Sequence, residues 1–228
     1  MSTIAANIST LESRIHAAAL AARRDPASVG LLAVSKTKPA SAIREAFAAG
    51  LRDFGENYLQ EALGKQAELS DLPLCWHFIG PIQSNKTRAI AEHFDWVHSV
   101  DRLKIAQRLS EQRPPQLEPL NICIQVNVSG EASKSGCTPQ DLPMLADAIS
   151  ALPRLRLRGL MAIPEPTDDI EAQQAAFATV TSLQQALNLP LDTLSMGMSH
   201  DLEAAISQGA TWVRIGTALF GARDYGQP

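Results

Sequence analysis

Short apolar runs, rich in β-branched residues, recur along this chain and alternate with stretches of helical periodicity. The runs are LLAVSK (31–36), RDFGE (52–56), CWHFIG (75–80), DWVHSV (95–100), NICIQVNV (121–128), RLRGLMAI (156–163), TLSMG (193–197) and TWVRIG (211–216). Strands that alternate with helices are typical of a parallel sheet with helical crossovers. Eight such units without a linker or a break in composition predict an α/β fold, a closed (β/α)8 TIM-type barrel. We therefore expect residues 1–228 to form a single domain.

The two ends of the chain complete this prediction. The N-terminal segment, residues 1–27, carries an amphipathic helix at about residues 2–24. Residues 217–228 are too few for a full last helix, so we expect the N-terminal helix to cover part of the gap. The alternative, a doubly wound open sheet, favours a glycine-rich turn after the first strand, and residues 36–40 (KTKPA) contain no glycine.

Composition excludes several classes of protein. Twenty basic and 24 acidic residues give a net charge of −4, which argues against a nucleic-acid-binding surface. No window approaches ~20 uninterrupted apolar residues, as a membrane span requires. Glu12 and Arg14 interrupt the N-terminal segment, unlike a secretory signal. Three cysteines in no metal-binding spacing indicate a reducing, cytoplasmic setting and buried, unreactive thiols, and we expect no metal site.

In a barrel of this type the active site lies at the carboxyl ends of the strands. The residues at those ends are Lys36, Asn57, His77, Ser99, Asn127, Met161, Ser199, Gly216 and Thr217. Ser199 is expected to open a helix (199–209) whose first N–H groups can receive an anion. Gly216 allows close approach of the backbone and Thr217 adds a hydroxyl, so these three residues predict a phosphate site. The alternative is that Ser199 only caps a helix and Gly216 only turns a corner.

Lys36 lies at the end of the first predicted strand, opposite this phosphate site. An amine forms a Schiff base only when it is unprotonated, and a neighbouring cation such as Lys38 lowers its pKa. A lysine facing a phosphate site suggests a phosphorylated aldehyde. Pyridoxal 5′-phosphate (PLP) is the first candidate and a sugar phosphate of an aldolase the second. A single solvated lysine is the simpler alternative.

Arg214 helps to choose between these ligands. Alternation along the last strand turns Arg214 and Gly216 toward the barrel interior. A guanidinium group can only donate hydrogen bonds, so it suits an unprotonated pyridine nitrogen. The alternative is an ion pair with a carboxylate at the same rim, such as Glu56.

Several motifs in register resemble the pyridoxal phosphate homeostasis protein family, PLP-binding proteins similar to the barrel domain of bacterial alanine racemase. They are AVSKTKP (33–39), FGENYLQE (54–61), WHFIGPIQSNK (76–86), HSVDR (98–102), SMGMSHDLEAAI (195–206) and VRIGTALFGAR (213–223). The resemblance extends over about residues 28–225, and the segment 127–136 also fits through Asn127, Glu131, Lys134 and Gly136.

The resemblance implies a role for each candidate residue. Lys36 is implied as the Schiff-base lysine, and Ser199, Gly216 and Thr217 as the phosphate-binding residues. Arg214 is implied to face the pyridine nitrogen. Asn57, His77 and Met198 are implied to line the pocket. His200 adds a titratable group near the phosphate site, without an implied role.

The resemblance also implies a function with little or no turnover. Alanine racemases add a C-terminal β domain that supplies a tyrosine acid/base to the partner subunit, whereas this chain has only Tyr58 and Tyr225. We therefore expect a PLP carrier or reservoir in vitamin B6 homeostasis, which delivers PLP to apo-enzymes. A weak amino-acid racemase is the alternative. Since the pocket needs no second domain, we also expect a monomer.

Overall fold

The computed structural model describes residues 3–130 and 135–222. Within them the parallel strands pair in sequence order and close into a barrel, which confirms the predicted fold. The strands are β1 (Gly30–Val34), β2 (Asp53–Glu56), β3 (Cys75–Phe78), β4 (Trp96–Val100), β5 (Leu120–Gln125), β6 (Leu155–Met161), β7 (Thr193–Ser195) and β8 (Trp212–Ile215).

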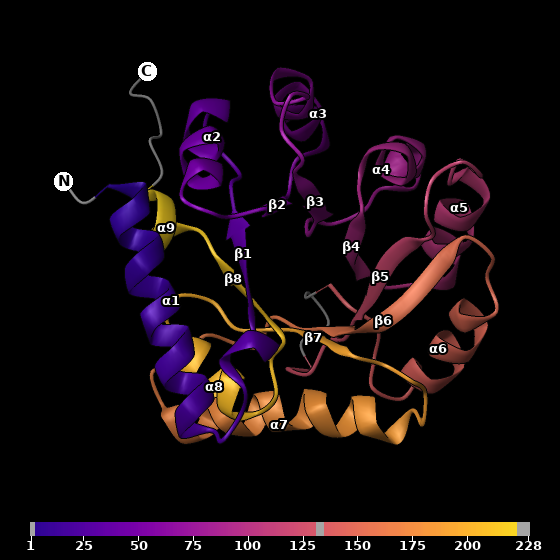
Figure 1. Cartoon of the computed structure of the whole chain (residues 1–228). Coiled ribbons are helices and arrows are strands. Elements are labelled where there is room, and N and C mark those ends of the chain that lie inside the picture. The colour runs from indigo at the N-terminus through magenta and orange to yellow at the C-terminus, as the bar shows by residue number, and fades with distance from the viewer. Residues whose placement is uncertain (1–2, 131–134, 223–228) are drawn as a thin grey trace, which may run out of the picture.

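Helices surround the barrel, as Figure 1 shows. They are α1 (Ile4–Ala21), α2 (Ala40–Ala48), α3 (Leu59–Glu68), α4 (Thr87–His93), α5 (Leu103–Gln112), α6 (Leu142–Ser150), α7 (Ile170–Ala186), α8 (Leu202–Ser207) and α9 (Thr217–Phe220), with 3-10 turns at Pro26–Ser28 and Ser84–Lys86. The main core lies between this ring and the strands, because the outward side chains of the strands pack against the apolar faces of the helices.

Closure of the barrel joins the first strand to the last. Strands β1 and β8 pair in parallel, with Leu32 opposite Arg214 and Ala33 opposite Ile215. This pairing places the segment after β1 beside the segment after β8, at the carboxyl ends of both strands. Residues more than 170 positions apart in the sequence are thereby neighbours at the barrel mouth.

Helix α1 covers the side of the barrel where the last helices are short. Its buried face, which includes Ile8, Leu11 and Ile15, packs against α8, α9 and α2. Figure 1 shows it running beside α9 and α8. Asn7 donates a hydrogen bond to the carbonyl of Leu219 (2.8 Å), and Arg24 donates to the carbonyls of Ile206 and Ala210. The expectation that an N-terminal helix fills this gap is confirmed.

One predicted element boundary is wrong. Helix α8 begins at Leu202, and Ser199 lies in the turn that precedes it. The Asp201 carboxylate accepts a hydrogen bond from the backbone N–H of Met198 (2.6 Å), and the N–H of Asp201 donates to the carbonyl of Met198. This local turn uses the backbone groups that a helix starting at Ser199 would need.

The cysteines are free thiols, and burial raises the pKa of the Cys137 thiol to about 11. Cys123 and Cys137 are buried, as expected, and Cys75 is only partly buried. In the described part of the chain, the helices are too short or too polar to cross a lipid bilayer.

Candidate functional site

Lys36, Gly216 and Thr217 share one small hollow at the barrel mouth. It measures about 40 Å³ and is also lined by Val34, Thr37, Lys38 and Gly221. Lys36 follows β1 and Gly216 follows β8, so the pairing of these two strands brings the residues together. The structure thus gathers three of the predicted site residues from the two ends of the chain.

Gly216 leaves this hollow open. A Cβ atom at this position would lie 3.3 Å from the carbonyl oxygen of Val34, closer than most such contacts. Gly216 also precedes α9, and its carbonyl accepts hydrogen bonds from the N–H groups of Leu219 (3.0 Å) and Phe220. A larger residue would therefore crowd the space between the ends of β1 and β8.

A buried ionic cluster supports the backbone on both sides of Lys36. The ammonium of Lys65 donates to the Glu56 carboxylate (2.7 Å), to the Glu61 carboxylate and to the carbonyl of Ser35 (2.7 Å). Glu61 also accepts a hydrogen bond from the backbone N–H of Thr37 (2.6 Å). Ser35 and Thr37 are the two neighbours of Lys36, so this cluster fixes where the lysine leaves the barrel.

Glu56 has an unusual environment for a carboxylate. Its side chain is fully buried, and its Oε1 accepts from Lys65 and from the Ser35 hydroxyl (2.5 Å). Its Oε2 has no partner within residues 3–130 and 135–222. Burial raises the pKa of Glu56, and the hydrogen bond and charge of Lys65 oppose this effect. Glu56 pairs with Lys65, so the alternative in which it neutralises Arg214 is not realised.

Arg214 faces the barrel interior, as predicted from alternation along its strand. Its guanidinium donates to the Ser195 carbonyl (2.6 Å), the Ser195 hydroxyl (2.9 Å) and the carbonyl of Ala162 (3.0 Å). Burial lowers the pKa of Arg214 to about 10, so the group remains a cation at neutral pH. Because Ala162 directly follows β6 and Ser195 ends β7, the guanidinium lies near the mouth.

His77 is not brought to the mouth with these residues. Its ring stacks on Trp96, meets Trp212 edge-on and contacts the carboxylate of Asp53 (3.1 Å). Each of these three partners is the first residue of its strand, so His77 lies toward the amino ends of the strands, the floor of the barrel. The expectation that His77 stands at the rim is therefore wrong. Alternation along a strand predicts which face a side chain takes but not its depth in a barrel.

A chain of hydrogen bonds connects His77 to Arg214 through the barrel interior. His77 Nδ1 lies 2.9 Å from His98 Nε2, and His98 Nδ1 lies 2.7 Å from the Ser195 hydroxyl. The Ser195 hydroxyl in turn accepts from Arg214. His77, His98, Ser195 and Arg214 are all buried. Burial and the neighbouring His77 and Arg214 lower the pKa of His98 well below its ordinary value, so its imidazole is neutral.

The carboxylate of Asp53 sets the direction of this chain. A carboxylate only accepts, so we assign the proton of His77 to Nε2. With one proton on each ring, His98 Nε2 donates to His77 Nδ1, and the Ser195 hydroxyl donates to His98 Nδ1. The oxygen of Ser195 is then free to accept from Arg214. Every hydrogen bond in the chain is satisfied in this arrangement.

A second and larger cavity adjoins the mouth. It measures about 440 Å³, within the usual range for a small-molecule site, and its lining includes Asn57, Gln125 and Ile163. The Oδ1 atom of Asn57 is buried and has no hydrogen-bond partner among the described residues. An unsatisfied buried acceptor at a cavity wall indicates a place for a donor from a ligand or from water.

Three further predicted residues lie at the edge of this region. Met198 and His200 are exposed in the turn before α8, with Ser199 between them. The carbonyl of Ser199 accepts from Arg14 (3.2 Å), which ties the turn to α1. Glu131, Lys134 and Tyr225 lie outside the described residues.

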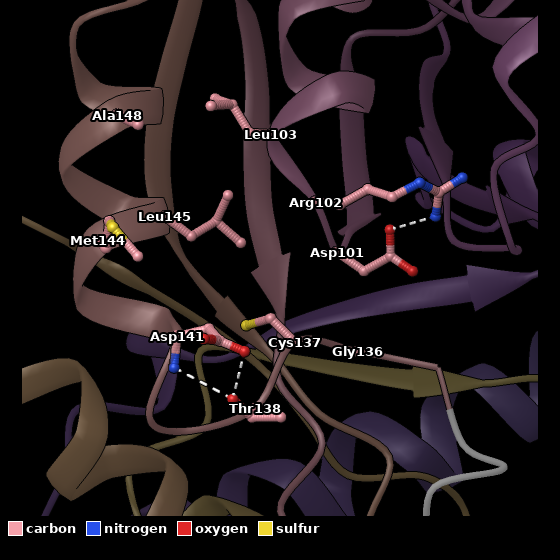
Figure 2. A pocket seen from close by; sticks show the side chains of 10 residues that line it. All are labelled: Asp101, Arg102, Leu103, Gly136, Cys137, Thr138, Asp141, Met144, Leu145 and Ala148. Atoms are coloured by element: carbon pink, nitrogen blue, oxygen red, sulfur yellow. Dashed lines mark hydrogen bonds and ion pairs between the residues drawn. The ribbon is translucent and has the colours of Figure 1, made fainter.

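Another groove lies away from these residues, between α5 and α6. It measures about 420 Å³, and Leu103, Met144 and Leu145 form its apolar wall. Figure 2 shows this wall together with the hydrogen-bonded pair of Thr138 and Asp141 and the ion pair of Asp101 and Arg102. None of the predicted site residues lines it.

Sequence reasoning missed the supporting residues Lys65, His98 and Ser195. Lys65 follows Glu61 by four positions, which is typical of an exposed helical ion pair, yet its side chain is only 7% exposed. His98 and Ser195 stand inside motifs that the sequence singled out, and alternation could have placed them in the barrel interior. Their mutual contact depends on the three-dimensional register of β4, β7 and β8.

Comparison with known proteins identifies the class to which this barrel belongs. The family model described as alanine racemase, N-terminal domain, matches residues 2–224. A Pseudomonas aeruginosa protein named pyridoxal phosphate homeostasis protein is 79% identical over 228 residues, covering 100% of this chain and 99% of the relative. The Escherichia coli K12 protein of the same name is 54% identical over 235 residues, covering 99% of each. The chain therefore belongs to the pyridoxal phosphate homeostasis protein family.

Solved structures agree with this assignment. PipY of Synechococcus elongatus, solved without PLP, shares 45% identity with a TM-score of 0.85, covering 96% of this chain and 100% of PipY. The same protein has been solved with PLP bound (44% identity, TM-score 0.85). Alanine racemase of Corynebacterium glutamicum superposes with a TM-score of 0.68 at 18% identity, covering 99% of this chain and 63% of the racemase. That likeness shows a common fold.

Proposed function

We propose that this protein binds PLP through a Schiff base at Lys36 and acts in the cytoplasm as a monomeric carrier or reservoir of the cofactor, with little or no turnover. The observation that carries the proposal is the hollow in which Lys36 faces Gly216 and Thr217, at the joined ends of β1 and β8. Membership of the pyridoxal phosphate homeostasis family and the PLP-bound structure of PipY support it.

The residues at the mouth fit the chemical groups of PLP. When bound, the cofactor supplies an aldehyde, a phosphate and an electron-withdrawing pyridine ring. Lys36 offers an amine held between two anchored neighbours, Ser35 and Thr37. Thr217 offers a hydroxyl, Gly216 an uncrowded backbone, and Ser199 a further hydroxyl for the phosphate. Asn57 and Met198 would line the sides of the pocket.

Arg214 would face the pyridine nitrogen. It is a buried cation whose described hydrogen bonds go to two carbonyls and one hydroxyl. A guanidinium group has no acceptor, so it keeps a neighbouring pyridine nitrogen unprotonated. In this account His77 acts from the floor, through His98 and Ser195, rather than by lining the pocket.

A donor-only partner for the pyridine nitrogen suits a carrier better than a racemase. An unprotonated pyridine ring stabilises a carbanion poorly, so proton abstraction from a bound amino acid is slow. Two-base racemisation also needs a second positioned acid, and acid–base groups contribute about 10²–10⁴ in rate. Tyr58, a tyrosine that could be considered for this acid, is 54% exposed at the start of α3 and is therefore not held in position by burial. The structure gives no specific support to the alternatives of a racemase or an aldolase.

We predict that Arg214→Gln weakens PLP binding about 10- to 100-fold, because one charge-assisted hydrogen bond contributes about 1.5–3 kcal/mol. Arg214→Glu should also shift the visible absorption band and raise the rate of slow transamination, since a carboxylate accepts a proton from a pyridinium. Absorbance titration with PLP and single-turnover transamination measure these effects.

Thermal unfolding of the PLP-free variants is the control, because both changes remove donors from the carbonyls of Ser195 and Ala162. Only variants that remain folded are compared for spectra and rates. Equal spectra and equal transamination rates in the wild type and both variants would show that Arg214 does not touch the cofactor ring.

A further inference from the structure

Three metal-ligating side chains converge at the floor of the barrel, at the far end of the hydrogen-bond chain from Arg214. Asp53 begins β2 and Cys75 begins β3, and the two residues pair across these strands. His77 follows Cys75 by two positions and so faces the same side of the sheet. One ligand atom from each residue lies within 4.8 Å of the other two.

The spacing of these atoms matches a tetrahedral metal centre. Zn²⁺ bonds of about 2.0–2.3 Å to oxygen, nitrogen and sulfur place neighbouring ligand atoms roughly 3.3–3.6 Å apart. His77 Nε2 lies 3.1 Å from Asp53 Oδ1 and 3.4 Å from the sulfur of Cys75. These two separations fit an ion bound to His77, and the third, between the ligand atoms of Asp53 and Cys75, is at most 4.8 Å.

The local charge also favours a cation. In the described part of the chain, the sole ion-pair partner of Asp53 is the His77 imidazole. The nearby Arg52 is turned away, since its guanidinium lies 3.8 Å over the Phe47 ring and donates to the carbonyls of Phe47 and Leu51. Asp95 adds a second carboxylate near Cys75 and accepts from the backbone N–H of Trp76 (2.8 Å).

The site is reached from solvent, and a hydrogen bond to His98 orients its histidine, His77. The Asp53 side chain is 30% exposed and lines a cavity of about 290 Å³, together with Gly30, Arg52 and Trp212. The cavity gives an ion a path as far as the Asp53 carboxylate and leaves room there for a water as fourth ligand. The other nitrogen of His77 is hydrogen-bonded to His98, the kind of outer partner that orients a ligating histidine.

We propose that Asp53, Cys75 and His77 form a binding site for a borderline-soft divalent cation, Zn²⁺ in the first place, with water as the fourth ligand. Binding breaks the S–H bond of Cys75, and that proton leaves to solvent. The proton of His77 moves from Nε2 to Nδ1, because Nε2 must give its lone pair to the metal.

The bound ion reverses the hydrogen bonds of the interior chain. With its proton on Nδ1, His77 donates to His98 Nε2, so His98 must carry its own proton on Nδ1. His98 then donates to the Ser195 hydroxyl, which had donated to it before. Ser195 directly contacts Arg214. The hydroxyl hydrogen of Ser195 must then turn away from His98, while its oxygen still accepts from Arg214. Occupancy of the floor thus reorients the hydroxyl to which the arginine at the mouth donates, without any contact between the ion and the mouth.

The test uses the full chain without PLP, titrated with Co²⁺ and then with Zn²⁺. We expect one ion per chain, tetrahedral visible bands from Co²⁺, a thiolate-to-cobalt charge-transfer band, and displacement of Co²⁺ by Zn²⁺. Cys75→Ser should remove the charge-transfer band and weaken binding by about 100-fold or more, since loss of a ligand costs at least as much as loss of an outer partner. Cys137→Ser, a buried cysteine in the groove between α5 and α6, should behave as the wild type.

Asp53→Asn serves as a second variant, because its amide oxygen still accepts from His77 and so preserves the fold while the charge is lost. It should weaken Zn²⁺ binding about 10- to 100-fold. Nitrogen-15 spectra of the histidines supply the other readout: Zn²⁺ should move the His98 proton from Nε2 to Nδ1. Absence of tight binding, a charge-transfer band that survives Cys75→Ser, or a His98 tautomer that Zn²⁺ leaves unchanged would overturn the proposal. These outcomes do not depend on PLP binding.

Discussion

Lys36→Ala is expected to abolish the covalent attachment of PLP and its visible absorption band, while weak binding of the cofactor persists. The amine is the only part of the proposed site that forms a bond with the aldehyde. In the proposed site Ser199, Gly216 and Thr217 would still offer donors to the phosphate, and hydrogen bonds to a charged group contribute about 1.5–3 kcal/mol each. Absorbance and equilibrium dialysis with PLP separate the two effects.

Lys38→Ala is the matched control for this change. Lys38 lines the same hollow, but its ammonium donates to the carbonyl of Ala222 (2.7 Å) and so is held by the C-terminal segment. The control should keep the absorption band of the wild type. A band of full strength in Lys36→Ala would mean that another lysine holds the aldehyde.

Lys65→Met is expected to lower the free energy of unfolding by about 3–5 kcal/mol, the usual cost of leaving one partner of a buried ion pair alone. Lys65 is 7% exposed and Glu56 is fully buried, so water cannot replace the lost ammonium. The change also removes a donor from the Ser35 carbonyl. The backbone before Lys36 should loosen, and PLP binding should weaken with stability. Urea unfolding measures the main effect.

The stability lost in Lys65→Met should depend on pH in a defined direction. Burial raises the pKa of Glu56 in the folded protein, and removal of Lys65 removes the group that opposes this rise. A carboxyl group with a raised pKa in the folded state binds more protons there than in the unfolded state, so stability increases as the pH falls toward its ordinary pKa. The variant should therefore lose less stability at about pH 5 than at about pH 8.

Arg44→Met is the control for this prediction. Arg44 pairs with Asp71 (2.6 Å) on the surface, where the two side chains are 47% and 59% exposed. Exposed ion pairs add little to stability, so this variant should unfold close to the wild type. If Lys65→Met and Arg44→Met lowered the free energy of unfolding by equal and small amounts, without pH dependence, the role assigned to the buried cluster would be contradicted.

The fold was largely predictable from the sequence, because the patterns that indicate each strand and helix lie within short segments of the chain. Apolar runs and helical stretches alternate along the chain, and each reports its own secondary structure. The inward face of Arg214 followed from alternation on β8. The start of α8 was misplaced because the side chain of Asp201 forms a turn that periodicity does not reveal.

The parts that the sequence could not reveal depend on register between distant strands. His77 was expected at the rim, but it shares the floor with Asp53, Trp96 and Trp212. The spacing of the cysteines predicted no metal site, because spacing describes only positions along the sequence. Asp53 and Cys75 meet because β2 and β3 pair. In the same way, the spacing of Glu61 and Lys65 is typical of an exposed helical ion pair. Only the packing of α3 against the barrel buries Lys65.

The central claim, that Lys36 holds PLP covalently, is tested most directly by reducing the PLP-loaded protein with borohydride and mapping its peptides by mass spectrometry. The account predicts loss of the visible band and one pyridoxyl-phosphate adduct, on the peptide that contains Lys36. A protein that takes up no PLP, that keeps its band after reduction, or that carries the adduct on another lysine such as Lys38 or Lys65 would contradict it.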